Sequence, residues 1–129
     1  MAIQVEYFRD KEILYKRAFQ LIEEQLQSGP SVFGLATGAT MEPLYSLLVN
    51  SALDFSNCKS FNLDEYIGLP KEHKETYFNF MRNELFNHVD INLDNCHVPN
   101  GDKDAIENSV KAYQTMLNNT NVDLQLLGI

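Results

Sequence analysis

A three-layer α/β fold, in which helices cover both faces of a mainly parallel sheet, is the architecture that this sequence predicts. Short apolar runs alternate along the chain with segments of helical periodicity, which is the pattern of such folds. Residues 31–36, SVFGLA, form a continuous apolar run, as expected for a strand covered on both faces. The 129 residues, 44% of them hydrophobic and 22% charged, suffice for one domain with its own core, so we expect a single domain over residues 1–129.

The first part of the chain predicts a strand, a helix, a second strand and a second helix. Residues 3–8 alternate roughly as a strand, and Asp10 is a suitable N-cap for the helix that follows. The inner face of that helix is predicted to carry Leu14, Ala18, Leu21, Ile22 and Leu26. Ser28-Gly29-Pro30 ends it, the strand of residues 31–36 comes next, and the second helix has an inner face of Leu44, Leu47 and Leu48.

The second part continues the alternation. Residues 58–63, CKSFNL, predict a strand that breaks at Asp64-Glu65-Tyr66, and a helix begins at Glu75 or Thr76 and extends to about residue 86. Residues 96–102 predict a short extended piece with an Asn-Gly turn. A last helix is predicted from the helical spacing of Ile106, Val110, Tyr113 and Leu117. Residues 122–129 predict a final strand, and because the chain stops at its apolar carboxyl end, we expect the sequence to be truncated there.

Composition argues against several classes of protein. The formal net charge is −8 and no cluster of Lys or Arg occurs, which argues against a nucleic-acid partner but not against a small anionic ligand. No run of ~18 apolar residues and no signal peptide is present, so we expect no membrane association. Cys58 and Cys96 lack CxxC spacing, which favours a reduced cytoplasmic protein over a disulfide or a metal site.

The turn Thr37-Gly38-Ala39-Thr40 joins a buried strand to a helix, and we interpret it as an anion site. Unpaired backbone N–H groups and the helix dipole favour a phosphate or carboxylate at a helix start. With Thr40 as N-cap, Pro43 would be the third helical residue and would lack an N–H, which leaves the Thr40 hydroxyl available to a ligand. The turn matches no nucleotide-binding motif, and small residues chosen for packing alone remain the alternative.

Asp64 and Glu65 follow the next strand directly and form the second candidate site. Adjacent carboxylates point in different directions, so one can face a cleft as a general base while the other orients a neighbour. Solvated turn acids or a helix cap are the alternatives. Tyr77 is either a core residue or an aromatic that leans over the cleft, and the three histidines are expected to be solvated or packed.

The segments GLATGATMEPLY, SFNLDEYIGLPKEHKETYFNFM, VPNGD and LQLLGI resemble glucosamine-6-phosphate deaminases of the glucosamine/galactosamine-6-phosphate isomerase family. The resemblance implies a Rossmann-like fold of the sugar-phosphate isomerase type. It also implies conversion of glucosamine 6-phosphate to fructose 6-phosphate and ammonia, with no metal or organic cofactor. By this resemblance Asp64 is the base that moves a proton between C2 and C1. Substrate and phosphate binding falls to Thr37, Gly38, Ala39, Thr40, Glu65 and Tyr77.

The resemblance also implies what this sequence lacks. In the family, the stretch after LLGI continues through Asp-Gly-His and Asn-Glu-Pro motifs and a later Lys, so we expect residues 1–129 to be the N-terminal half of the enzyme with little turnover alone. The alternatives are a non-catalytic sugar-phosphate-binding domain and a 6-phosphogluconolactonase-like hydrolase. Tyr66 disfavours the hydrolase, since lactonases tend to carry Arg there. A homo-oligomer is left open, because exposed strand edges favour self-association.

Overall fold

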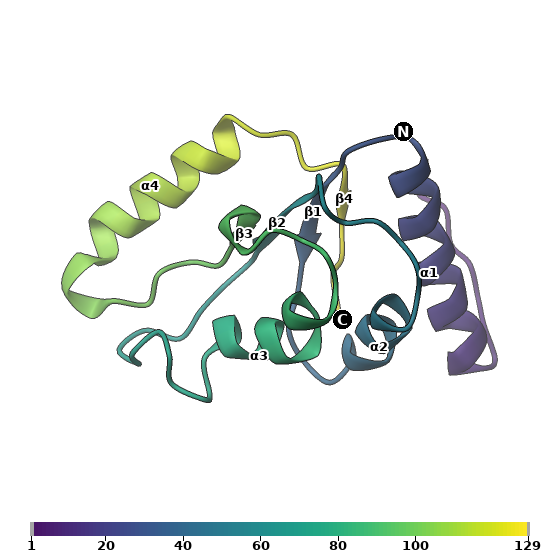
Figure 1. Ribbon diagram of the computed structural model, residues 1–129, viewed down its shortest axis with the longest axis horizontal. Helices are drawn as coiled ribbons and strands as arrows, with labels where there is room; N and C mark the ends of the chain where they lie inside the picture. Colours follow the sequence, from purple (N-terminus) through teal and green to yellow (C-terminus); the bar gives the residue numbers. More distant parts are fainter. Residues whose placement is uncertain (1, 129) are drawn as a thin grey trace.

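Four parallel strands form the sheet of this protein, whose computed structural model describes residues 2–128. Their order is β3-β2-β1-β4 (Figure 1). The strands are β1 (Val32–Leu35), β2 (Lys59–Asn62), β3 (Cys96–His97) and β4 (Leu124–Gln125). The α-helices are α1 (Lys11–Gln27), α2 (Glu42–Val49), α3 (Tyr77–Glu84) and α4 (Ile106–Asn118). Short 3-10 helices occupy Phe86–His88, Leu93–Asn95 and Lys103–Ala105.

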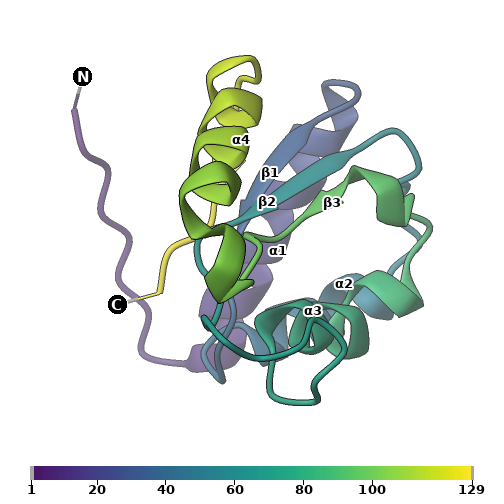
Figure 2. The same cartoon turned by 90° about the vertical axis from the view of Figure 1, so that its left-hand side faces the viewer.

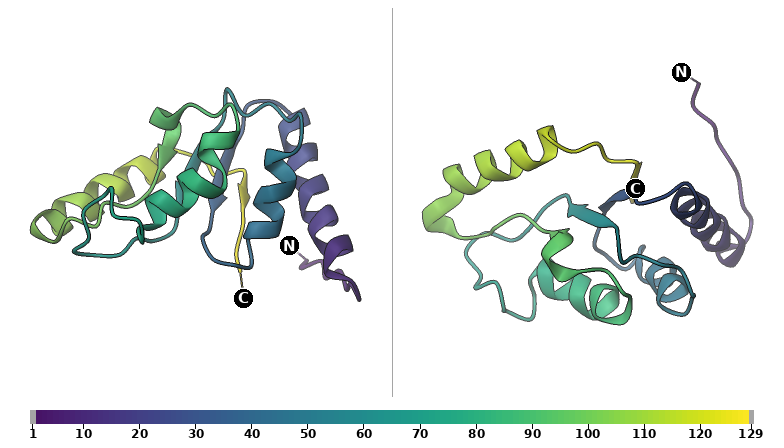
Figure 3. Two further views of the ribbon diagram at one scale, coloured as in Figure 1. Left: turned by 60° about the horizontal axis from the view of Figure 1, so that its bottom comes forward. Right: turned by 45° about the horizontal axis from the view of Figure 1, so that its top comes forward.

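Helices lie on both faces of the sheet, which confirms the predicted three-layer class. Helices α1, α2 and α3 lie side by side on one face, and α4 lies on the opposite face (Figure 3). The core lies between the sheet and the three-helix face, where β1 contributes Phe33 and Leu35, and the helices contribute Ile22, Tyr45, Leu48 and Met81. On the other face, the ring of Phe61 contacts the ring of His97 in β3 and the ring of Tyr113 in α4.

Helix α1 is capped as predicted, although its buried face is turned slightly. The Asp10 carboxylate accepts a hydrogen bond from the Glu12 amide at 2.7 Å. Leu14 and Leu21 were predicted to face inward but are 43% and 42% exposed, so they flank the buried stripe. The residues that pack on the core are Tyr15, Ala18, Phe19, Ile22 and Leu26. Aromatic residues can fill the inner face of a helix as well as leucines can. The spacing of apolar residues therefore did not determine which of them lie at the middle of the buried face of α1.

Two of the predicted strands need correction. Residues 3–8 form no strand and lie outside the sheet (Figure 2), with Ile3 and Tyr7 each 91% exposed. An alternating pattern gives a strand only where a sheet edge is available, and here Glu6 instead pairs with Arg17 of α1 at 2.9 Å. The strand predicted for residues 122–129 is limited to β4, and Ile129 lies outside the described residues.

Smaller differences concern helix ends and faces. Helix α3 ends at Glu84, and Phe86, predicted to belong to it, begins a 3-10 helix. Val110 is 61% exposed although its spacing placed it on the inner face of α4. Cys58 is buried, Cys96 is partly buried, and neither forms a disulfide within the described residues. Within residues 2–128 no helix combines the length and apolarity that a bilayer crossing needs.

Candidate active site

The carboxyl edge of the parallel sheet brings the two predicted sites together. From β1 the chain proceeds outward to β2 and β3, and then returns to place β4 on the other side of β1 (Figure 1). Such a reversal opens a crevice at the carboxyl ends of the strands, which is where open α/β sheets bind ligands. The Thr37–Thr40 turn follows β1 directly at this point, and Asp64 follows the neighbouring strand β2.

The Thr37–Thr40 turn presents backbone donors that the chain does not use. The Met41 amide donates to the Gly38 carbonyl at 3.0 Å and closes the turn. Within the described residues, the amides of Gly38, Ala39 and Thr40 donate to no group of the chain. No side chain caps α2 either, so the positive end of its dipole faces the same turn. Three consecutive free amides before a helix start are a suitable cradle for an anion.

The backbone of this turn differs in one detail from the prediction. Helix α2 begins at Glu42 and Met41 is its N-cap residue, so Pro43 is the second helical residue and Thr40 precedes the cap. The prediction that Thr40 is the N-cap was therefore wrong, and the Thr40 hydroxyl caps no amide of α2. Gly38 has a φ of +108°, which only glycine adopts readily, whereas no other kind of residue in 2–128 has a positive φ. Ala39 is therefore compatible with the turn.

Two tyrosine hydroxyls and the segment after β4 hold the turn in place. The Tyr15 hydroxyl of α1 donates to the Thr40 carbonyl at 2.7 Å. The buried Tyr45 hydroxyl of α2 donates to the Ala36 carbonyl, where β1 ends. Thr40 and Met41 also lie against the segment after β4, within 4.0 Å of where a side chain on Gly128 would begin. Sequence reasoning missed Tyr15, because its partner lies 25 residues away.

Asp64 leaves the sheet at the same edge as the turn. The parallel β1–β2 ladder ends with the pair Leu35 and Asn62, so Thr37 and Asp64 each come two residues after the last pair, at the carboxyl ends of neighbouring strands. Asp64 is exposed. The Asn62 carbonyl before it accepts a hydrogen bond from the Tyr113 hydroxyl of α4 at 2.6 Å, which anchors the end of β2.

Glu65 faces the protein rather than the turn. Its carboxylate accepts hydrogen bonds from three backbone amides: Tyr66 at 2.8 Å, Tyr77 at 2.9 Å and Phe78 at 3.0 Å. The last two belong to the first turn of α3, so Glu65 caps this helix together with Thr76, whose hydroxyl accepts from the Asn79 amide at 3.2 Å. One of the two adjacent acids is thus exposed and the other orients its neighbours.

Tyr77 stands beside these acids, paired with Tyr66. The two ring centroids are 4.7 Å apart. The neighbouring Tyr66 hydroxyl, which favours the protonated phenol of Tyr77, contributes most to raising the pKa of Tyr77 to about 12, and the charges of Asp64 and Glu65 act in the same direction. The phenol of Tyr77 therefore keeps its proton at neutral pH, and this uncharged aromatic ring lies near Asp64.

A separate cavity of about 560 Å³ lies farther toward β3. It is lined by two loops, residues 68–71 and 96–104, by the start of α3 and by Met116 near the end of α4. The Gly68 amide joins the two loops by donating to the Gly101 carbonyl at 2.8 Å. A side chain at Gly101 would begin 1.9 Å from the Tyr66 carbonyl oxygen, so these loops require glycine. Of the predicted site residues, Glu65 lines this cavity, whereas Asp64 and the turn do not.

His73, His97 and Cys96 make contacts that support the fold of the described chain. His97 is stacked on Phe61 with centroids 4.7 Å apart, and burial lowers its pKa. The His73 ring accepts from the Glu75 amide at 3.1 Å. Burial raises the pKa of the Cys96 thiol to about 11, which keeps this group protonated and unreactive at neutral pH.

One edge of this parallel α/β sheet thus carries unpaired turn amides after β1 and an exposed carboxylate after β2. Residues 10–129 match the family model described as glucosamine-6-phosphate isomerases/6-phosphogluconolactonase. The chain belongs to this family.

Relatives named glucosamine-6-phosphate deaminase occur in several bacteria. The relative from Alkaliphilus oremlandii is 40% identical, over 100% of this chain and 55% of its own length. The one from Clostridium novyi is 41% identical, over 95% of this chain and 53% of its own length. The chain therefore spans about half the length of the curated relatives that it matches.

Solved structures agree with the fold. A monomeric glucosamine-6-phosphate deaminase superimposes with a TM-score of 0.93 at 31% identity, over 98% of this chain and 55% of that one. A 6-phosphogluconolactonase from Thermotoga maritima gives a TM-score of 0.76 at 21% identity, over 92% of this chain and 55% of that one, which shows a common fold.

Proposed function

We propose that this chain carries the phosphate-binding and proton-transferring part of a glucosamine-6-phosphate deaminase, which converts glucosamine 6-phosphate to fructose 6-phosphate and ammonia. The observation that carries the proposal is the row of three unpaired amides, at Gly38, Ala39 and Thr40, at the same sheet edge as the exposed carboxylate of Asp64. The relatives named as deaminases support this substrate.

In the proposed reaction the phosphate is an anchor that takes no part in bond making. The turn amides and the hydroxyls of Thr37 and Thr40 hold it, so that the sugar carbon chain extends over the end of β2 toward Asp64. Asp64 takes the proton from C2 of the open-chain amino sugar and returns it at C1, which leaves a C=N bond at C2. Water adds to this bond and ammonia leaves, so that the ketose forms. Anchoring the remote phosphate makes this transfer effectively intramolecular. Tyr77 contributes an aromatic surface for the sugar.

We also propose that residues 1–129 correspond to the N-terminal half of such an enzyme and turn over little or no substrate alone. The chain spans about half the length of its relatives, and its own residues account for the anchor and one base. A 6-phosphogluconolactonase-like hydrolase is the second candidate, favoured only by the shared fold. Tyr66 at the position after the Asp-Glu pair favours the deaminase.

Two measurements test the proposal. Titration with glucosamine 6-phosphate, followed by backbone amide resonances, is expected to shift Gly38, Ala39 and Thr40 in a saturable way. Ammonia release from the same substrate is expected to be absent or slight for residues 1–129. Turn amides that stay unmoved at millimolar substrate would refute the anchor. Binding of 6-phosphogluconolactone with its hydrolysis, and without ammonia release from the amino sugar, would favour the lactonase alternative.

A further inference from the structure

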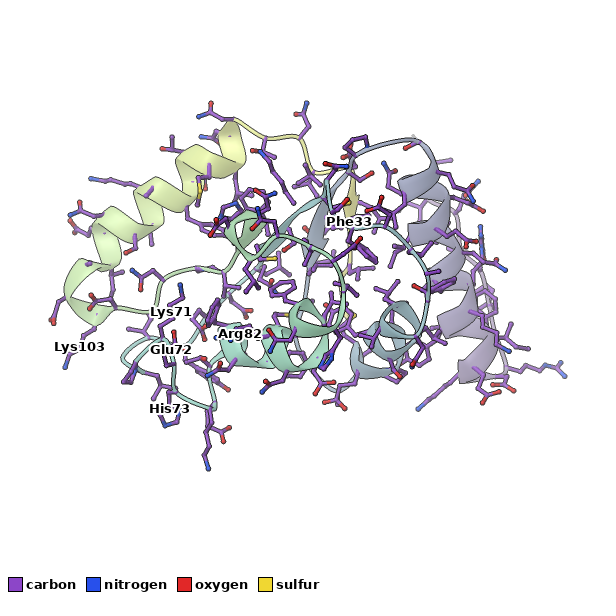
Figure 4. All side chains as sticks on the ribbon, in the orientation of Figure 1. Phe33, Lys71, Glu72, His73, Arg82 and Lys103 are labelled. Carbon is purple, nitrogen blue, oxygen red and sulfur yellow. The ribbon has the colours of Figure 1, made fainter. Side chains whose placement is uncertain are left out.

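The hydrogen bond between Tyr15 and Thr40 joins α1 to the turn before α2. The Tyr15 hydroxyl donates to the Thr40 carbonyl at 2.7 Å, although the two residues are 25 positions apart in the sequence. The Tyr15 ring packs against the buried core, to which Phe33 of β1 belongs (Figure 4). Because this packing holds the ring, its hydroxyl is a fixed donor at the turn.

This bond is the first of a chain of hydrogen bonds that ends at a free amide. The Thr40 carbonyl belongs to the same peptide unit as the Met41 amide, and that amide donates to the Gly38 carbonyl at 3.0 Å. The Gly38 carbonyl shares its peptide unit with the Ala39 amide, which donates to no group within residues 2–128. Each donor in the chain thus leads from the Tyr15 hydroxyl toward the Ala39 amide.

Hydrogen bonds that follow one another in this way polarise each other. A carbonyl that accepts a hydrogen bond makes the N–H of its own peptide unit a better donor, and each bond strengthens the next by roughly 10–30%. The two peptide units of the turn are also held at their oxygens, so their N–H groups keep one direction. An anion at the Ala39 amide would therefore meet a donor that is already oriented and polarised.

We propose that Tyr15 is a positioning residue for the substrate phosphate, because its hydroxyl acts through two peptide units to orient and polarise the Ala39 amide. This inference rests on the proposed function, in which the Thr37–Thr40 turn anchors the phosphate. In this role Tyr15 contacts the turn rather than the phosphate and takes no part in proton transfer. Loss of its hydroxyl therefore weakens phosphate binding and leaves the base, Asp64, unchanged.

The experiment is a titration of this chain with inorganic phosphate, followed by backbone amide and carbonyl-carbon resonances, in the wild type and in Tyr15→Phe. In the wild type, the Ala39 amide shifts in a saturable way. Because the coupling is reciprocal, the Thr40 carbonyl carbon shifts with it as the bond from Tyr15 strengthens. In Tyr15→Phe, which keeps the ring, phosphate affinity falls by about two- to fivefold. The Thr40 carbonyl response is lost in this variant, whereas the Gly38 carbonyl still responds.

Ser51→Ala is the matched control, because it also removes a hydroxyl that donates to a backbone carbonyl of α2, that of Leu48 at 2.6 Å. This bond lies at the other end of α2, so Ser51→Ala is expected to keep the wild-type phosphate affinity and the Thr40 carbonyl response.

Two results would overturn the role of Tyr15 and leave the phosphate anchor standing. One is a wild-type chain whose Ala39 amide responds to phosphate while the Thr40 carbonyl does not, which needs no variant. The other is a Tyr15→Phe variant with wild-type affinity. An Ala39 amide that stays unmoved by phosphate in the wild type would instead refute the anchor itself, and the inference with it.

Discussion

Replacing Gly38 by alanine isolates the contribution of the turn backbone to anion binding. Gly38 has a φ of +108°, and a Cβ placed there meets no atom within 4 Å, so the substitution strains the backbone without a steric clash. The left-handed conformation costs a non-glycine residue roughly 1–2 kcal/mol. We expect the turn to relax and to misalign its free amides. A hydrogen bond to a charged group contributes roughly 1.5–3 kcal/mol, so losing one weakens phosphate affinity by at least about tenfold.

Gly29 provides a matched control for this prediction. It also has a positive φ, +123°, and a Cβ placed on it would meet no atom within 4 Å, but it lies after α1, before the amino end of β1. Urea unfolding is expected to show a similar loss of about 1–2 kcal/mol for Gly38→Ala and Gly29→Ala. Phosphate binding, measured by amide titration, is expected to weaken only in Gly38→Ala. Equal affinity in Gly38→Ala and the wild type would refute the turn as the anion site.

Three further predictions follow from the same contacts. In any form of the protein that releases ammonia, Asp64→Asn is expected to lower turnover by about 10²-fold or more with phosphate affinity kept, and unchanged turnover would remove Asp64 as the base. Tyr113→Phe is expected to lower the free energy of unfolding by about 1–3 kcal/mol in urea, because the Asn62 carbonyl loses the hydroxyl that donates to it. Tyr7→Phe, at a residue 91% exposed, is expected to change it by less than about 0.5 kcal/mol. Burial raises the pKa of Tyr45 and Tyr113, so these phenols ionise at lower pH in the unfolded chain than in the folded one. Their contribution to the free energy of unfolding is therefore expected to be full below about pH 10 and to fall above it. A free energy of unfolding that rises with alkaline pH would contradict this.

The fold class and most elements were predictable because their signals are local. The apolar run of residues 31–36 indicated β1, and Asp10 indicated the start of α1. Residues 3–8 misled, because their alternation fits any sheet edge and no edge of the described sheet accepts them. Strand pairing depends on which edges remain open after the other elements have packed, and no short segment contains that information.

The candidate site was predictable in part for a similar reason. The Thr37–Thr40 turn and Asp64 each follow a strand directly, and the carboxyl ends of parallel strands share an edge, so their proximity followed from the alternation of elements. The role of Glu65 did not, since its partners at Tyr77 and Phe78 lie 12 and 13 residues away. Tyr113, 51 residues from Asn62, carried no signal at all beyond its helical spacing.

Local chemistry in the chain was enough to specify a glycine turn with unpaired amides after one strand and an acid pair after the next. Folding in three dimensions determined which acid stays exposed, because the amides at the start of α3 bind Glu65 and leave Asp64 exposed. It also chose which helix start stays open to an anion, since hydrogen bonds between distant segments form only where packing brings donor and acceptor within about 3 Å.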